Sequence, residues 1–93
     1  MHDETERLFG ARVRELRLAR GLTQEQLAER AHLHRTYVAS IETGQRNVAL
    51  VNVVYLSRAL DVSPGDLFAN FTPDVLRTLP PNTRNQTRAR REK

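Results

Sequence analysis

The fold is decided by residues 22–44, which read LTQEQLAERAHLHRTYVASIETG. Thr23 is a typical helix N-cap, and Gln26, three residues later, completes a capping box with it. These signals predict a short helix from residue 24 to about residue 31. A turn of only three residues separates it from a second predicted helix, which covers residues 35–43. The stretch therefore predicts two short helices that meet at a tight turn.

Helix signals also lie on both sides of this pair, and no stretch of alternating apolar residues indicates a strand. Apolar residues recur at helical spacing over residues 4–20 and again from Leu50 to Leu60. Ser-Pro at residues 63–64 and Thr-Pro at residues 72–73 are typical helix starts, and the second predicts a turn or two that ends near Leu79. We therefore expect an all-α fold of five helices with a short extra C-terminal helical turn.

The charge is concentrated at the C-terminal end. The 93 residues carry a formal net charge of +4, and residues 80–93 hold all of it, since the basic and acidic residues before them are equal in number. We expect a folded domain over residues 1–79 and a basic, disordered tail over residues 80–93. Two interpretations of the tail remain open: an arm that adds affinity for a nucleic-acid backbone, and a solubilising terminus.

Composition also excludes several classes of protein. The chain has no cysteine, which excludes a disulfide scaffold, and no apolar run approaches the roughly 18 residues of a membrane span. We expect a cytoplasmic, nucleoid-associated protein with no membrane contact. Three histidines without zinc-ligand spacing predict no metal site, and the absence of a nucleophile motif or a glycine-rich phosphate loop predicts that the chain is not an enzyme. We expect no cofactor and no small-molecule ligand.

The second helix of the pair has an outer face that suits the major groove of DNA. On a helical wheel its inner face holds Tyr37, Val38 and Ile41, which we expect to pack. The outer face consists of Arg35, Thr36, Ala39, Ser40 and Thr43. Small side chains allow the backbone to approach base edges, and we expect Arg35 to reach a guanine while Thr36 and Ser40 donate or accept hydrogen bonds.

Polar residues flank this face on both sides and are candidates for contacts with the DNA backbone. Gln24 stands at the first position of the preceding helix, where its amide and the backbone N–H groups can hold a phosphate oxygen. On the other side we expect backbone contacts from Gln45, Arg46 and Asn47. Tyr37 and Thr43 complete this set, and Tyr37 is placed where it can support a deformed base step.

Four motifs occur in the order of a known family: LTQEQLA at 22–28, YVASIETG at 37–44, RN at 46–47 and SPGDLF at 63–68. They resemble the XRE family of helix-turn-helix regulators, which includes lambda-type phage repressors and Cro, over roughly residues 7–70. The resemblance implies a compact lambda-repressor-like domain that binds double-stranded DNA as a homodimer on partly palindromic operators. Within the family the chain is most similar to the controller proteins of restriction-modification systems.

The resemblance also implies roles for single residues. Gln24 matches the phosphate-holding glutamine of the family, and its base-reading positions are matched by Arg35, Thr36 and Ser40. Arg17 and Glu42 match a buried structural ion pair, so we do not count Arg17 as a DNA contact. The sequence departs from the family at two helix starts: His34 is a poor cap, and Ala49 stands where the family commonly has a Ser or Thr cap. We expect Asn47 to cap the fourth helix instead.

The fourth helix is apolar on more than one side. We assign its core set as Leu50, Val53, Val54, Leu56 and Leu60. Val51 and Tyr55 lie one turn apart beside this set. Either Tyr55 covers the edge of its own core, or it forms a dimer interface with Val51, Phe68 and Phe71.

Two alternative functions fit the same sequence. The first is an antitoxin of the same fold, whose main task is to bind a toxin protein. The second is a non-specific nucleic-acid binder that acts through its basic tail.

Overall fold

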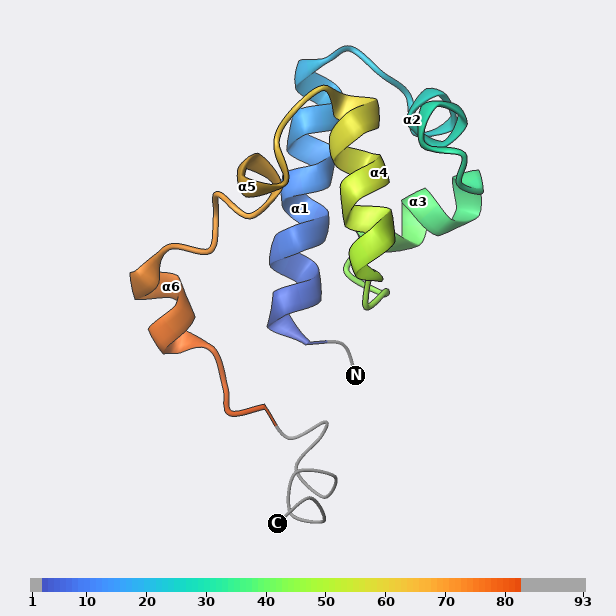
Figure 1. Ribbon diagram of the computed structural model, residues 1–93. Coiled ribbons are helices and arrows are strands. Elements are labelled where there is room, and N and C mark those ends of the chain that lie inside the picture. Colours follow the sequence, from blue (N-terminus) through green and yellow to red (C-terminus); the bar gives the residue numbers. More distant parts are fainter. Residues whose placement is uncertain (1–2, 83–93) are drawn as a thin grey trace.

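The computed structural model describes residues 3–82, and within this range it has six helices and no strand (Figure 1). The helices are α1 (Glu4–Ala19), α2 (Gln24–Ala31), α3 (Arg35–Glu42), α4 (Leu50–Leu60), α5 (Pro64–Leu67) and α6 (Pro73–Thr78). The all-α prediction is confirmed. Of the predicted basic tail over residues 80–93, the structure describes only residues 80–82. The arginines of the tail lie outside the described residues. No described helix meets the length and hydropathy that a membrane crossing requires.

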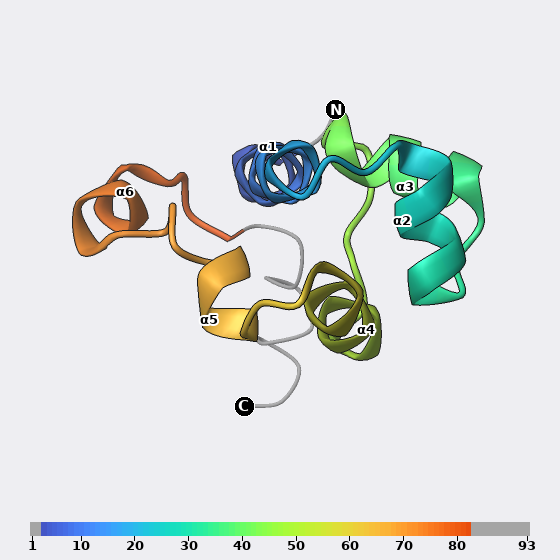
Figure 2. The same cartoon turned by 90° about the horizontal axis from the view of Figure 1, so that it is seen from above.

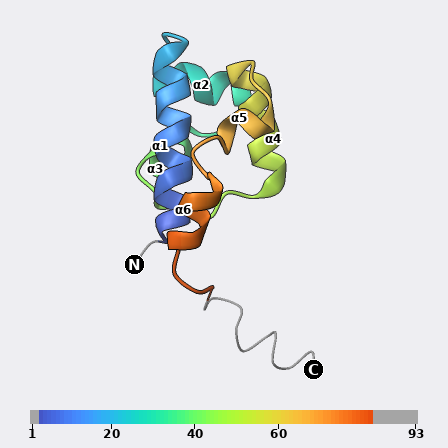
Figure 3. The same cartoon turned by 90° about the vertical axis from the view of Figure 1, so that its left-hand side faces the viewer.

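The helices α1 and α4 face each other across the core, as Figures 2 and 3 show. One side of the core is closed by α2 and α3, of which α3 packs on α1 and α2 packs on α4. On the other side α5 contacts both α1 and α4. The last helix, α6, stands apart from this five-helix bundle and buries none of its own residues (Figure 2).

Local signals account for the start of the helix pair. Thr23 Oγ1 accepts a hydrogen bond from the backbone N of Gln26 at 3.0 Å, and the Gln26 side chain accepts one from the backbone N of Thr23 at 2.9 Å. The turn that follows reverses at His32, which has a left-handed φ of 56°, and the N–H of Leu33 donates to the oxygen of Ala28. The capping box is therefore as predicted, and α2 ends in a left-handed residue.

The core is built from the inward faces of α1 to α5. Its fully buried side chains are Val13, Leu27, Val38, Ile41, Leu56, Leu60 and Leu67. Because each helix contributes an apolar stripe that it cannot bury alone, these side chains hold α2 and α3 at a fixed angle to α1 and α4.

Two expectations for α4 are wrong. Leu50 is 79% exposed and Val54 is 48% exposed, although both were assigned to the core. The inward arc of α4 consists of Val53, Leu56, Ser57, Ala59 and Leu60. Since apolar residues occur around the whole helix, hydrophobicity alone does not say which arc packs inward. Asn47 also does not cap α4: the helix begins at Leu50, with Ala49 at the N-cap and no side-chain hydrogen bond.

Candidate nucleic-acid interface

The exposed face of α3 carries the four residues predicted for base reading, together with Thr43 from the predicted backbone contacts. Arg35, Thr36 and Thr43 are exposed, and Ala39 and Ser40 are half-buried beside them. The opposite face, with Val38 and Ile41, is buried in the core. As predicted, α3 thus has one packed face and one outward face of small and hydroxyl side chains around a single long donor. His34 at the N-cap makes no side-chain cap hydrogen bond.

Arg35 stands at the start of α3, next to the N-terminal half of α2. Its Nη1 is 4.0 Å from Oε2 of Glu25, and both side chains are exposed. An exposed ion pair at this distance contributes little. The guanidinium is therefore held loosely and can exchange Glu25 for an acceptor on a ligand.

Ser40, Tyr37 and Arg46 form a small cluster at the edge between the outward face of α3 and its packed face. Ser40 Oγ donates to the backbone oxygen of Tyr37 at 2.7 Å and accepts from Nε of Arg46 at 3.0 Å. The Arg46 guanidinium lies 5.5 Å from the centroid of the Tyr37 ring. Because a serine hydroxyl has one hydrogen, Ser40 in this arrangement can accept from a base but cannot donate to one.

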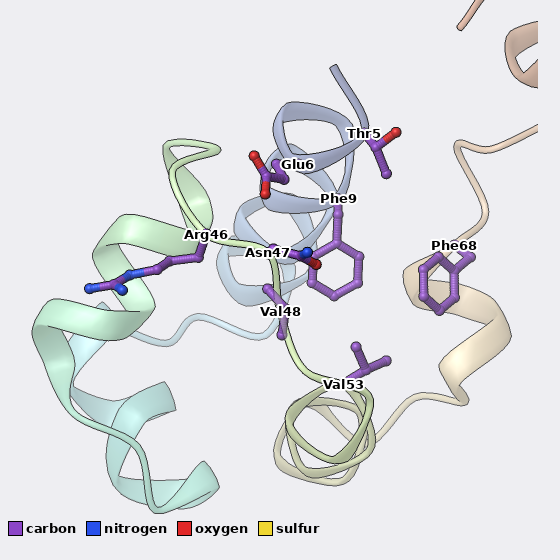
Figure 4. Close-up of a pocket in the computed structure, with 8 residues that line it drawn as sticks. All are labelled: Thr5, Glu6, Phe9, Arg46, Asn47, Val48, Val53 and Phe68. Atoms are coloured by element: carbon purple, nitrogen blue, oxygen red, sulfur yellow. The ribbon is translucent and has the colours of Figure 1, made fainter. Parts of the chain in front are cut away.

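Figure 4 shows where Arg46 points. Its backbone borders an apolar hollow of about 170 Å³, whose floor includes Phe9, Val53 and Phe68, between α1, α4 and α5. The Arg46 side chain leaves this hollow and extends toward α3. The side chain thus reaches α3, where its Nε donates to Ser40.

The loop between α3 and α4 places the remaining backbone-contact candidates. Gln45, Arg46 and Asn47 are exposed in it. Gly44 starts the loop with φ of 78°, and a Cβ at this position would be 2.6 Å from Cγ of Arg7. Glycine is therefore required both by the backbone conformation and by the close approach of α1. The hydroxyl of Thr43 contacts the backbone oxygens of Ala39 and Ser40, both at 3.2 Å.

A buried ion pair lies under α3. Arg17 donates to Glu42 with two nitrogens, from Nε to Oε2 at 2.6 Å and from Nη2 to Oε1 at 3.0 Å, and donates from Nη1 to the oxygen of Leu22 at 2.7 Å. Both residues are buried. The pair joins α1 to α3 in the bidentate geometry that is typical of strong arginine–carboxylate pairs.

Besides the phosphate contact predicted for it, Gln24 has a partner within the protein that the sequence did not indicate. Its Nε2 donates to Oε1 of Glu42 at 3.1 Å, and the side chain is half-buried. One hydrogen of the Gln24 amide is therefore donated to the carboxylate of the ion pair. The other N–H of the same amide remains for a phosphate oxygen, at an orientation that Glu42 sets.

The sequence model of the helix-turn-helix family matches residues 13–67, which is more than half of the chain. The chain belongs to this family. It is a helix-turn-helix DNA-binding regulator of the XRE type and not an enzyme. The resemblance drawn from the motifs is confirmed.

Several relatives of this helix-turn-helix regulator are controller proteins. It is 51% identical over 61 residues to control protein C.BamHI of Bacillus amyloliquefaciens, which covers 64% of this chain and 75% of that protein. The crystal structure of the restriction-modification controller protein C.AhdI of Aeromonas hydrophila matches with 53% identity and a TM-score of 0.68, over 69% of this chain and 97% of that one. A third relative carries the name "Putative antitoxin HigA2" and comes from Mycobacterium tuberculosis; it is 48% identical over 54 residues, 58% of this chain and 50% of that protein.

The residues expected at a dimer interface lie at two places on the bundle. Val51 and Tyr55 are exposed on α4, where Leu50 and Val54 extend the same apolar face, and the Arg58 guanidinium lies 5.1 Å from the Tyr55 ring centroid. Phe68 is partly exposed after α5, and its ring packs at a tilt between Phe9 and Phe71, at centroid distances of 5.4 and 5.8 Å. Phe71 itself is half-buried against the core.

Proposed function

We propose that this regulator is the controller protein of a restriction-modification system, acting in the cytoplasm as a homodimer on a partly palindromic operator. Support comes from identities of 51% and 53% to controller proteins across the helix-turn-helix. The outward face of α3 is the observation that carries the proposal. In it, base-edge contacts fall to Arg35, Thr36, Ala39 and Ser40, and backbone contacts fall to Gln24, Tyr37, Thr43, Gln45, Arg46 and Asn47.

Competition between duplexes tests this proposal. A labelled duplex from upstream of the protein's own gene is bound and then challenged with the same duplex unlabelled, or with duplexes of shuffled sequence. The proposal predicts that the native sequence competes at least a hundredfold better at physiological salt, since specific sites are bound roughly 10³-fold or more tighter than other DNA. Equal competition by shuffled duplexes would contradict it.

The homodimer places two α3 helices about one DNA turn, roughly 34 Å, apart. We assign the dimer interface to the exposed apolar face of α4, because a contiguous exposed apolar face is typical of an interface. Tyr55 is 39% exposed at the edge of this face, and Leu50, Val51 and Val54 complete it.

Tyr55→Ala is expected to raise the dimer dissociation constant about tenfold or more, because aromatic side chains dominate such interfaces. Sedimentation equilibrium at micromolar concentration measures the effect. Leu18→Ala is the matched control, since Leu18 is exposed on α1, away from this face. If the dissociation constant of Tyr55→Ala equals those of the wild type and of Leu18→Ala, Tyr55 does not belong to the interface.

An antitoxin is the second candidate function, and the identity of 48% to HigA2 favours it specifically. In that case the chain binds a toxin protein encoded next to its own gene. Expression together with the neighbouring gene distinguishes the two: a stable complex between the two products supports the antitoxin, and a neighbouring restriction enzyme or methyltransferase that does not co-purify supports the controller.

A further inference from the structure

A chain of polar contacts runs from α4 to the outward face of α3 and begins at Asn52. Asn52 is half-buried on α4, and its Nδ2 donates to the hydroxyl oxygen of Tyr37 on α3 at 3.2 Å. The Tyr37 ring then lies under the Arg46 guanidinium, and Nε of Arg46 donates to Ser40. Three residues of the candidate interface are thus connected to one side chain that does not lie on it.

The direction of the first hydrogen bond matters for what Tyr37 can do. A tyrosine hydroxyl has one hydrogen to donate and lone pairs that accept. Because the Asn52 amide donates, the hydroxyl of Tyr37 serves as the acceptor in this contact. Its own hydrogen is left to donate elsewhere.

The contact also fixes the position of the ring. Tyr37 is half-buried and packs against the core, so its hydroxyl end is the part that a hydrogen bond can still position. The ring carries the guanidinium of Arg46 on its face, at 5.5 Å from the centroid. A change in the ring's position therefore moves the cation as well.

We propose that Asn52 is a positioning residue for DNA binding: it holds Tyr37 so that the hydroxyl donates to a phosphate oxygen of the DNA backbone beside Arg46. This inference rests on the proposed function, since it requires DNA at the outward face of α3. Asn52 itself acts through Tyr37 and does not contact DNA. Leucine at this position has a similar volume but cannot donate, and aspartate can only accept, which turns the Tyr37 hydrogen toward α4.

The contact is tested first in the protein without DNA. The chain has two tyrosines, so labelling with [¹³Cζ]tyrosine gives two resonances, and Tyr55→Phe assigns them. We expect Asn52→Leu to shift the Tyr37 resonance. Asn70→Leu, at an exposed position after α5, is the control for an added surface leucine and is expected to shift neither. An unmoved Tyr37 resonance in Asn52→Leu contradicts the contact.

The role in binding is tested by a double-mutant cycle on a duplex selected by the wild type from a random library. We expect Asn52→Leu and Tyr37→Phe each to weaken binding about five- to tenfold, as the loss of one hydrogen bond predicts. The double variant is expected to be no weaker than Tyr37→Phe alone. Effects that multiply instead would show that Asn52 does not act through Tyr37.

Asn52→Asp tests the direction of the hydrogen bond in the same cycle. Its negative charge repels DNA whether residue 37 is tyrosine or phenylalanine, so comparison of the two backgrounds removes that effect. The proposal predicts that Asn52→Asp weakens DNA binding more when residue 37 is tyrosine than when it is phenylalanine. Equal losses of affinity in the two backgrounds contradict it. If the wild type selects no duplex at all, the proposed function fails; if it selects one and Asn52→Leu binds it normally, only this inference fails.

Discussion

Glu42→Ala is expected to lower the free energy of unfolding by about 3 to 5 kcal/mol, and with it Tm by at least about 12 °C. The substitution leaves the guanidinium of Arg17, whose side chain is only 9% exposed, without its carboxylate. The amide of Gln24 loses its acceptor at the same time. Thermal unfolding followed by circular dichroism at 222 nm measures the change.

A double variant separates the missing partner from the loss of packing. Replacement of both members by apolar residues, Arg17→Met with Glu42→Leu, removes the uncompensated charge, and we expect it to recover much of the stability lost by Glu42→Ala. An unchanged Tm for Glu42→Ala would refute the structural role of the pair. A double variant as unstable as the single one would show that packing, and not charge, is responsible.

Gly10→Ala is expected to destabilise the fold by about 2 to 3 kcal/mol or more, although alanine is the better helix former. A Cβ on Gly10 would be 2.0 Å from the backbone oxygen of Ile41, where α1 passes α3. Helix propensity favours alanine by about 1 kcal/mol, but the Cβ is fixed rigidly to the backbone of α1 and the atom it meets is a backbone oxygen of α3, so only a shift of a whole helix can relieve the clash. Urea unfolding gives the difference in free energy.

Gly65→Ala is the matched control for this prediction. Gly65 also lies in a helix, α5, but a Cβ there would meet only Ser63 Oγ, at the ordinary distance of 3.5 Å. We expect this variant to be as stable as the wild type or slightly more so. If Gly10→Ala unfolds at the same urea concentration as Gly65→Ala, then α1 and α3 are not as close as the structure places them.

Local signals were sufficient to predict most of the fold. The capping box at Thr23, the Ser63-Pro64 start and the Thr72-Pro73 start each describe a contact between residues within a few positions of one another, and each helix begins where its signal predicts. The outward face of α3 was equally predictable, because a helix of eight residues with one apolar stripe can pack in one orientation only.

Contacts between distant parts of the chain were not predictable in this way. The orientation of α4 depends on what α2 and α5 present to it, so Leu50 and Val54 were misplaced. The bond from Gln24 to Glu42 and that from Asn52 to Tyr37 each join two helices and leave no periodic signal. A signal did exist for the close approach of α1 and α3: Gly10 is a glycine within a helix, where its low propensity needs a reason.

The central claim is that α3 reads DNA sequence, and selection of bound duplexes from a random library tests it most directly. The wild type is predicted to recover a partly palindromic sequence with a guanine in each half. Arg35→Ala is predicted to lose about 1 to 3 kcal/mol of preference at that guanine while keeping the rest of the sequence. If Arg35→Ala recovers the same sequence with the same preference, or if the wild type recovers none, the outward face of α3 does not read DNA.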